Sequence, residues 1–201
     1  MSSFFSGISV LTVILVLGAL SPSASASEII ELQLRWHAQF QFAGYYAALE
    51  KGFYKDAGLD VIITEGQPDK KPVAQVLGRV AHYGVGNSEV LLTRLQGAPL
   101  VALAAVLQHS PSVLIAKKSS KIATPHDLIG KKVMIMGEQV DADFVAMFHN
   151  ENIDYTQIDL TPSSYQIQDL VDDKVDVFNS YLSNEPFYLH ERGIEHTVIN
   201  P

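Results

Sequence analysis

Apolar and polar positions alternate or cluster along the chain in patterns that predict strands separated by helices. Residues 30–36 read I-E-L-Q-L-R-W, the period-two alternation of a half-buried strand. Residues 42–50 are rich in Ala and Tyr and are followed by Gly52, a residue type that commonly ends a helix. Residues 100–107 form an uninterrupted apolar run, which is typical of a strand in a parallel sheet that is covered on both faces.

This alternation of strands and helices occurs in two successive series. In the first series we expect strands over residues 30–36, 59–64, 83–86 and 100–107, and helices over 42–50, 72–77 and 88–96. In the second we expect strands over 132–136, 157–160, 175–178 and 196–199, and helices over 141–150, 165–172 and 184–192. Such alternation favours βαβ units and a mainly parallel sheet. The predicted fold class is α/β, with residues 27–116 as lobe 1 and residues 117–201 as lobe 2, facing each other across a cleft.

The amino terminus carries the pattern of an export signal. Residues 1–26 contain no charged side chain, and an apolar run over residues 7–20 is followed by Pro22 and then Ala24-Ser25-Ala26. The run is shorter than the roughly 18 to 20 apolar residues that cross a bilayer, and a small-x-small end is typical of a cleavage site. We expect a signal peptide cleaved after Ala26 and a periplasmic location. An uncleaved signal anchor is the alternative.

Composition disfavours several kinds of partner and site. The chain has 14 basic and 22 acidic residues and a net charge of −8, which disfavours binding to nucleic acid. It has no cysteine, which excludes disulfides, thiolate metal sites and thiol nucleophiles. We expect no metal site, because only His190 and His196 have a ligand-like spacing. Asp141 and Asp143 are interpreted as acids that favour a helix N-terminus rather than as cation ligands.

Catalytic and cofactor motifs are also missing from the sequence. Gly84-Val85-Gly86 lacks the third glycine of a dinucleotide fingerprint, because Glu89 occupies that place. No Gly-x-Ser-x-Gly, P-loop or His-Glu-x-x-His motif occurs. We therefore expect no cofactor. Asn87 and Ser88, which follow this segment, are expected to cap the next helix.

Loops that follow the predicted strands are the candidates for ligand binding. In open parallel sheets, ligands bind beyond the carboxyl ends of the strands, where loops lead into helix N-termini. The loop over residues 36–42 mixes flat rings, which stack on a planar ligand, with amides, which read its hydrogen-bonding edge. These features favour a small polar, heteroaromatic ligand. The residues expected to contact it are Trp36, Gln39, Gln41, Tyr45, Asn87, Ser88, His109, Gly137, Glu138, Gln139, Asn184 and Glu185.

Some residues near these loops also have a purely structural interpretation. Phe42 and Tyr46 lie on a helical spacing and are expected in the core, whereas Trp36, the only tryptophan, is expected to face the cleft from a strand end. The carboxylates of Glu138 and Glu185 either pair with an amino group or cationic ring of a ligand or simply favour a helix N-terminus.

Several segments carry a resemblance to a known family. They are R-W-H-A-Q-F-Q-F-A-G-Y-Y-A-A-L-E-K-G-F-Y-K-D-A-G-L-D-V at residues 35–61, Y-G-V-G-N-S-E-V-L-L at 83–92, D-L-I-G-K-K-V-M-I-M-G-E at 127–138 and S-N-E-P-F at 183–187. The chain resembles the thiamine-biosynthesis-type solute-binding proteins, which are type II periplasmic binding proteins related to the sulfonate and taurine receptors. The resemblance implies a two-lobed Venus flytrap that closes on its ligand.

The resemblance also implies a function. This branch binds pyrimidine precursors of thiamine or related heterocycles, for an ABC permease or as the input domain of a membrane signalling protein; an alkylsulfonate-type receptor is another alternative. Trp36 would stack on the ligand. A eukaryotic enzyme of the family carries a Lys and a His that would fall near Gly86 and Val90, so no catalysis is expected here.

The chain departs from the family pattern in two places. The family's Gly-Glu-Phe-Gly loop falls on residues 137–140, where Gln139 and Val140 replace the Phe and the second Gly. Family members continue past a final Asn-Pro with a segment that returns to the first lobe. The sequence stops at Pro201, so lobe 1 is expected to be incomplete.

Overall fold

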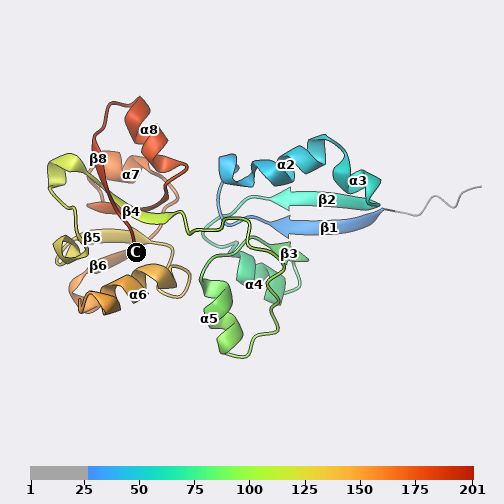
Figure 1. Ribbon diagram of the computed structural model, residues 1–201, viewed down its shortest axis with the longest axis horizontal. Helices are drawn as coiled ribbons and strands as arrows, with labels where there is room; N and C mark the ends of the chain where they lie inside the picture. The colour runs from blue at the N-terminus through green and yellow to red at the C-terminus, as the bar shows by residue number, and fades with distance from the viewer. Residues whose placement is uncertain (1–26) are drawn as a thin grey trace, which may run out of the picture.

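Two sheets, each covered by its own helices, form two lobes that lie side by side (Figure 1). The computed structural model describes residues 27–201, and the expected signal peptide lies outside these residues. Within residues 27–201, no helix is long and apolar enough to cross a membrane.

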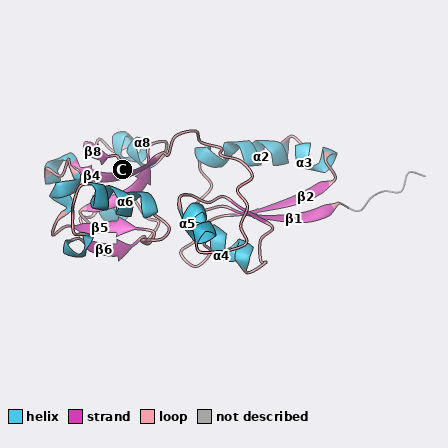
Figure 2. Ribbon diagram, turned by 60° about the horizontal axis from the view of Figure 1, so that its bottom comes forward, coloured by secondary structure: helices cyan, strands magenta, loops and turns pink. Residues whose placement is uncertain are grey.

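The first lobe contains a three-stranded parallel sheet in the order β2-β1-β3. Its strands are β1 (Glu28–Gln33), β2 (Leu59–Thr64) and β3 (Tyr83–Gly84). Its helices are η2 (Phe40–Phe42), α2 (Ala43–Glu50), α3 (Phe53–Asp56), α4 (Pro72–Leu77) and α5 (Glu89–Leu95). The helices α2 and α3 lie on one side of the sheet and α4 and α5 on the other (Figure 2). The loop that follows β1 lies next to the second lobe, where Arg35 contacts Tyr181 and Asp141.

The second lobe contains a five-stranded sheet in the order β6-β5-β7-β4-β8. Its strands are β4 (Ser112–Lys117), β5 (Lys132–Ile135), β6 (Asp159–Pro162), β7 (Val177–Tyr181) and β8 (His196–Ile199). Its helices are η3 (Lys118–Ser120), η4 (Pro125–Leu128), α6 (Ala142–Asn150), η5 (Tyr155–Gln157), α7 (Gln168–Val171) and α8 (Glu185–Glu191). The strands β5, β6 and β7 are parallel, whereas β4 runs antiparallel to both β7 and β8.

Apolar burial links the two lobes. One buried cluster joins Ile30 and Leu34 of the first lobe to Met134 and Phe178 of the second, and another lies within the second lobe. The lobes therefore share part of their hydrophobic core, and this shared core supports the polar cleft described below.

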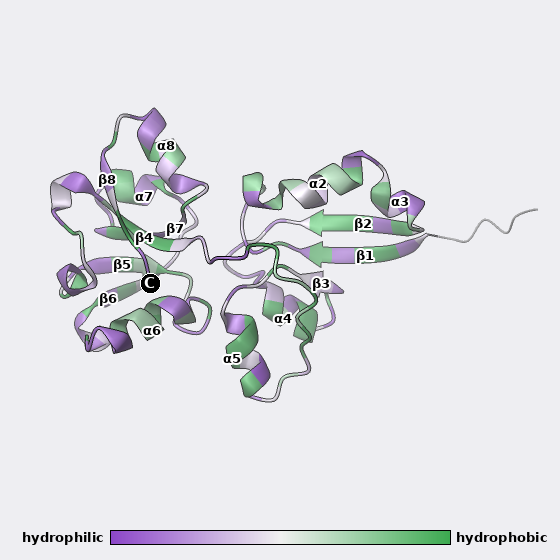
Figure 3. Ribbon diagram, in the orientation of Figure 1, coloured by the Kyte–Doolittle hydropathy of each residue, from purple (hydrophilic) through white to green (hydrophobic). Residues whose placement is uncertain are grey.

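The apolar run at residues 100–107 is not a strand, so this prediction is wrong. It pairs with no other segment of the described chain, and residues 101–107 are exposed although their side chains are hydrophobic (Figure 3). The strand lies instead at β4, a few residues further along the chain. A strand needs hydrogen-bonded neighbours, and β4 has two, in β7 and β8. The whole of β4 belongs to the second sheet, whereas the expected lobe boundary after residue 116 divides it.

The core of the second lobe provides a stability prediction. Phe148 of α6 is fully buried, and replacing it with alanine is expected to lower the free energy of unfolding by about 3–5 kcal/mol. Phe187 of α8 is 60% exposed, so Phe187→Ala is expected to change this free energy by no more than about 0.5 kcal/mol. Urea unfolding of both variants measures the difference, and equal losses would contradict the assigned core.

Candidate functional site

A cavity lies between the two lobes, beyond the carboxyl ends of β1, β5 and β7. The space within it, part of which opens to solvent, is about 340 Å³. Its walls combine aromatic and aliphatic surface with amides, hydroxyls and charged groups. The lining residues are Arg35, Trp36, Gln41, Ser112, Met136, Asp141, Phe144, Asn179, Ser180, Tyr181, Asn184 and Glu185.

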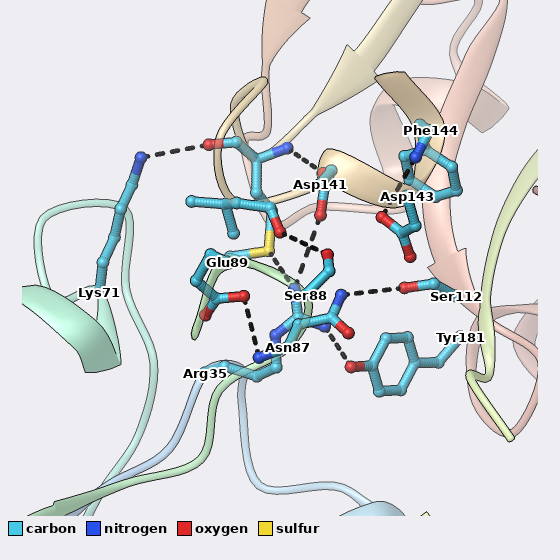
Figure 4. A network of polar contacts seen from close by, with 12 residues as sticks. Arg35, Lys71, Asn87, Ser88, Glu89, Ser112, Asp141, Asp143, Phe144 and Tyr181 are labelled. Atoms are coloured by element: carbon cyan, nitrogen blue, oxygen red, sulfur yellow. Dashed lines mark hydrogen bonds and ion pairs between the residues drawn. The ribbon is translucent and has the colours of Figure 1, made fainter. Parts of the chain in front are cut away.

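Arg35, which lines this cavity, reaches from the first lobe to Tyr181 and Asp141 of the second (Figure 4). It follows β1, is only 5% exposed, and donates a hydrogen bond from Nη1 to the hydroxyl of Tyr181. Its Nη2 lies 3.3 Å from the sulfur of Met136 and 3.6 Å from Oδ1 of Asp141. Burial alone would lower the pKa of Arg35, but Tyr181, Asp141 and Glu89 raise it above its usual value. The guanidinium is therefore a permanent buried cation.

Two buried carboxylates surround this cation. Asp141 precedes α6, is 1% exposed, and accepts a hydrogen bond from the backbone N–H of Met136 at 2.7 Å. Burial raises the pKa of Asp141 to about 6, and Arg35 opposes that rise. Glu89 begins α5, is 4% exposed, and accepts a hydrogen bond from the backbone N–H of Asn87. Burial also raises the pKa of Glu89, again against the attraction of Arg35.

The raised pKa of Asp141 predicts a specific pH dependence of stability. The pKa of Asp141 is about 6 in the folded protein and 3.8 ordinarily. The folded state therefore binds the proton of this carboxyl group more tightly than the unfolded state does. The resulting stabilisation is complete below about pH 4 and is lost as the pH rises through 6. The stability of the wild type relative to Asp141→Asn should therefore fall between pH 4.5 and pH 7.5, by about 2 kcal/mol. Urea unfolding of both proteins at the two pH values measures this, and a constant difference would contradict it.

A third carboxylate, Glu185, lies at the start of α8. It is 4% exposed, and its Oε2 accepts hydrogen bonds from the hydroxyl of Ser180 at 2.9 Å and from the backbone N–H of Tyr181 at 3.0 Å. These bonds hold the turn between β7 and α8 in place. The carboxylate therefore lines the cavity in a fixed orientation.

Trp36 is held by an aromatic stack that crosses between the lobes. Its ring lies 4.2 Å from that of Tyr165, with 16° between the planes, and Tyr165 does not line the cavity. The hydroxyl of Tyr165 also donates a hydrogen bond to the carbonyl of Gln67 in the first lobe. Tyr165 therefore fixes the orientation of the indole, part of which remains on the cavity wall.

Polar contacts close the lobes on one another around the cavity. Lys71 donates a hydrogen bond to the carbonyl of Met136 at 3.2 Å, and Asn87 donates one to Ser112 at 3.3 Å. Ser88 donates one to the carbonyl of Val140 at 3.5 Å. These bonds add polar contacts to the apolar core that the two lobes share.

Three polar atoms of the lining residues are buried without a hydrogen-bond partner. They are Nε of Arg35, Oε1 of Gln41 and Oδ1 of Asn179. Buried polar groups are almost always paired, and each exception needs a physical reason. Because all three belong to residues that line the same cavity, a bound ligand is the simplest partner.

The structure brings some of the predicted ligand-binding residues together and separates others. Those that line the cavity are Trp36, Gln41, Asn184 and Glu185. Those in contacts beside it, or in the turn that precedes Asp141, are Asn87, Ser88, Gly137 and Gln139. Those outside it are Gln39, which accepts a hydrogen bond from Gln41, the half-buried Tyr45, and the exposed Glu138 and His109. Ligand contact by any of these residues stays a prediction.

Two structural interpretations of the sequence have different outcomes. Phe42 is 2% exposed and belongs to the core, as predicted. The expectation that the side chains of Asn87 and Ser88 cap α5 is wrong, because that helix has no side-chain cap bond. Instead, Glu89 accepts from the backbone of Asn87, and both predicted caps bond to the second lobe.

Sequence reasoning missed the polar centre of the site. Arg35 occupies a polar position of the strand pattern, where solvent is the usual neighbour, yet both it and Gln33 are buried. Asp141 is predicted only as an acid that favours a helix N-terminus, but it also contacts Arg35. Their positions in the sequence could have indicated a role in the site. Arg35 lies shortly after the first strand and Asp141 lies directly before a helix, and both places are at the expected cleft.

Comparison with protein-family models shows to which family the chain belongs. A family model described as NMT1/THI5 like matches residues 39–201. The chain belongs to the NMT1/THI5-like family. The predicted resemblance to thiamine-precursor-type binding proteins is thereby confirmed at the family level.

Two curated relatives of this NMT1/THI5-like chain are named for binding, and a third is named as a synthase. The chain is 27% identical over 176 residues to the riboflavin-binding protein RibY of Chloroflexus aurantiacus, covering 85% of this chain and 50% of that protein. It is 24% identical over 205 residues to the formylaminopyrimidine-binding protein of Halalkalibacterium halodurans, covering 98% and 62%. A 4-amino-5-hydroxymethyl-2-methylpyrimidine phosphate synthase of Legionella pneumophila is 27% identical over 117 residues, covering 57% and 37%. The chain thus spans about half to two thirds of the length of the two binding proteins.

Solved structures show the same fold. An ABC uptake transporter substrate-binding protein from Streptococcus pneumoniae with bound histidine matches with a TM-score of 0.58 and 20% identity, covering 86% of this chain and 74% of that one. The periplasmic aliphatic sulphonate binding protein SsuA from Escherichia coli matches with a TM-score of 0.54 and 16% identity, covering 86% and 56%. These matches confirm the predicted two-lobed α/β fold of periplasmic binding proteins.

Proposed function

We propose that the protein is an exported solute-binding protein that captures a small heteroaromatic ligand, a thiamine pyrimidine precursor or a related ring, for an ABC importer. The observation that carries this proposal is the cavity between the lobes, which combines Trp36 with unpaired polar atoms of Gln41 and Asn179. A flat ring gains dispersion energy on the indole while its edge pairs with the amide oxygens. Relatives named for binding riboflavin and formylaminopyrimidine, both heteroaromatic, support the ligand class.

Two further features support export and uptake. The charge-free apolar segment at residues 1–26 has the pattern of a signal peptide. The matching fold of a substrate-binding protein from an ABC uptake transporter supports delivery to a permease. No catalysis is proposed, because the positions expected to carry the Lys and His of the family's enzyme are near Gly86 and Val90.

The only tryptophan of the chain provides the test. Trp36 lines the cavity, so its fluorescence should report ligand entry. Titration with 4-amino-5-hydroxymethyl-2-methylpyrimidine, formylaminopyrimidine and riboflavin is expected to change the emission saturably for at least one of them. Free N-acetyltryptophanamide, titrated in parallel, corrects for absorption by the ligand. A folded protein whose corrected emission is unchanged by all three would contradict the proposal.

A further inference from the structure

The charge of the cavity wall is negative although one buried cation lies at its base. Among the described residues that line the cavity, Arg35 is the only one with a basic side chain, whereas Asp141 and Glu185 are both acidic. Glu89 lies just outside the lining, and its charge acts on both Arg35 and Asp141. Lys71, also outside the lining, donates to the carbonyl of Met136. The lining itself therefore presents two carboxylates and one cation to a ligand.

The guanidinium of Arg35 already contacts several groups within the protein. Nη1 donates to Tyr181, and Nη2 faces Met136 and Asp141. Nε has no hydrogen-bond partner. Arginine frequently binds phosphate or sulfonate through two parallel N–H donors of the guanidinium. Offering such a pair to a ligand would compete with the contacts of Arg35 to Tyr181 and Asp141.

The unpaired side-chain oxygens can accept hydrogen bonds from a ligand. Oε1 of Gln41 and Oδ1 of Asn179 are both acceptors. Amino groups and ring N–H groups satisfy them, whereas phosphate and sulfonate oxygens add further acceptors. Aromatic and thioether surface from Trp36, Phe144 and Met136 completes a slot suited to a flat ring.

We propose that the cavity selects an uncharged or cationic ring that carries N–H donors and rejects the phosphorylated or sulfonated form of the same ring. This inference rests on the proposed function and names its ligand class more narrowly. Rejection follows from repulsion between the carboxylates of Asp141, Glu89 and Glu185 and the added acidic group, which carries a charge of about −2 for a phosphate ester at pH 7.5. We expect this repulsion to weaken binding by about 100-fold.

Calorimetric titration with matched pairs tests the proposal at pH 7.5 and fixed ionic strength. The pairs are 4-amino-5-hydroxymethyl-2-methylpyrimidine with its phosphate ester, and riboflavin with its phosphate ester. We expect the unphosphorylated member of the binding pair to have a Kd about 100-fold lower. Equal affinity, or tighter binding of the phosphate, would overturn the charge selection and leave the proposed function intact. Binding of neither pair by folded protein would overturn the proposed function, and the charge selection with it.

Charge variants locate the source of the discrimination. Glu89→Gln and Asp141→Asn each remove a carboxylate near the cavity and are expected to reduce the discrimination between the two members about tenfold. Glu191→Gln removes the same charge from an exposed position of α8 and is expected to leave the ratio unchanged. The wild-type ratio stands as a test even if one buried variant fails to fold. An equal effect of all three variants would assign the discrimination to net charge and contradict the role of the cavity.

Discussion

Replacing Arg35 with methionine is expected to lower the free energy of unfolding by about 3–5 kcal/mol at pH 7.5. The change leaves Asp141 and Glu89 buried, at 1% and 4% exposure, with no counter-charge. It also removes the donors to Tyr181 and Met136 that tie the first lobe to the second. Methionine keeps much of the aliphatic volume, so the loss reports charge and hydrogen bonding rather than a cavity.

Urea unfolding followed by circular dichroism measures this loss. Arg192→Met is the matched control, because Arg192 is exposed and bonds only to Gln168 across the surface; it should cost about 1 kcal/mol or less. Combining Arg35→Met with Asp141→Asn should restore at least about 1 kcal/mol, because the buried charge is then removed with its partner. If Arg35→Met costs no more than Arg192→Met, the buried ion pair does not hold the lobes together.

Replacing Trp36 with alanine is expected to weaken ligand binding by about 30-fold or more, the effect of removing a central aromatic anchor. The indole supplies a flat wall of the cavity, and Tyr165 holds it in a stacked orientation. Trp36→Phe keeps a ring at the position and should lose less affinity than the alanine variant. Since Trp36 is also largely buried, circular dichroism must show that both variants are folded at the temperature of the titration.

Calorimetric titration measures the ligand affinity of Trp36→Ala and Trp36→Phe and shows whether the ring of Trp36 contacts the ligand. A large loss for alanine and a small loss for phenylalanine supports an aromatic platform. Wild-type affinity in a folded Trp36→Ala protein would place the ligand elsewhere. Tyr165→Phe serves as the control for indirect effects, because it retains the ring that stacks on Trp36 and removes only the hydrogen bond to Gln67.

The local sequence pattern predicts the bounds of a helix or strand correctly where nearby residues of the chain are enough to determine that element. The strand at residues 59–64, the helix at 72–77 and the strand at 196–199 have the predicted bounds. Residues 100–107 and 113–116 are both apolar runs, and composition does not distinguish which of them finds strand partners. That outcome depends on β7 and β8, which lie far along the chain.

The sequence predicts where the candidate site lies, but it predicts only some of the side chains that form it. The rule that ligands bind beyond the carboxyl ends of parallel strands selected the loops of Trp36, Gln41, Asn184 and Glu185, which line the cavity. The contact of Arg35 with Asp141 joins two lobes and could not be found from local spacing. The charge balance of the cavity depends on that contact.

The most direct test of heteroaromatic capture is the melting temperature of the protein across a ligand panel. The panel contains 4-amino-5-hydroxymethyl-2-methylpyrimidine, formylaminopyrimidine, riboflavin, glutamine and an alkanesulfonate. A ligand at 100 times its Kd stabilises the folded state by about 2.7 kcal/mol, which raises the melting temperature by several degrees. A rise of that size with at least one of the heterocycles, and none with glutamine or the sulfonate, is the expected result. A rise with glutamine or the sulfonate alone, or with no member of the panel, would contradict heteroaromatic capture between the lobes.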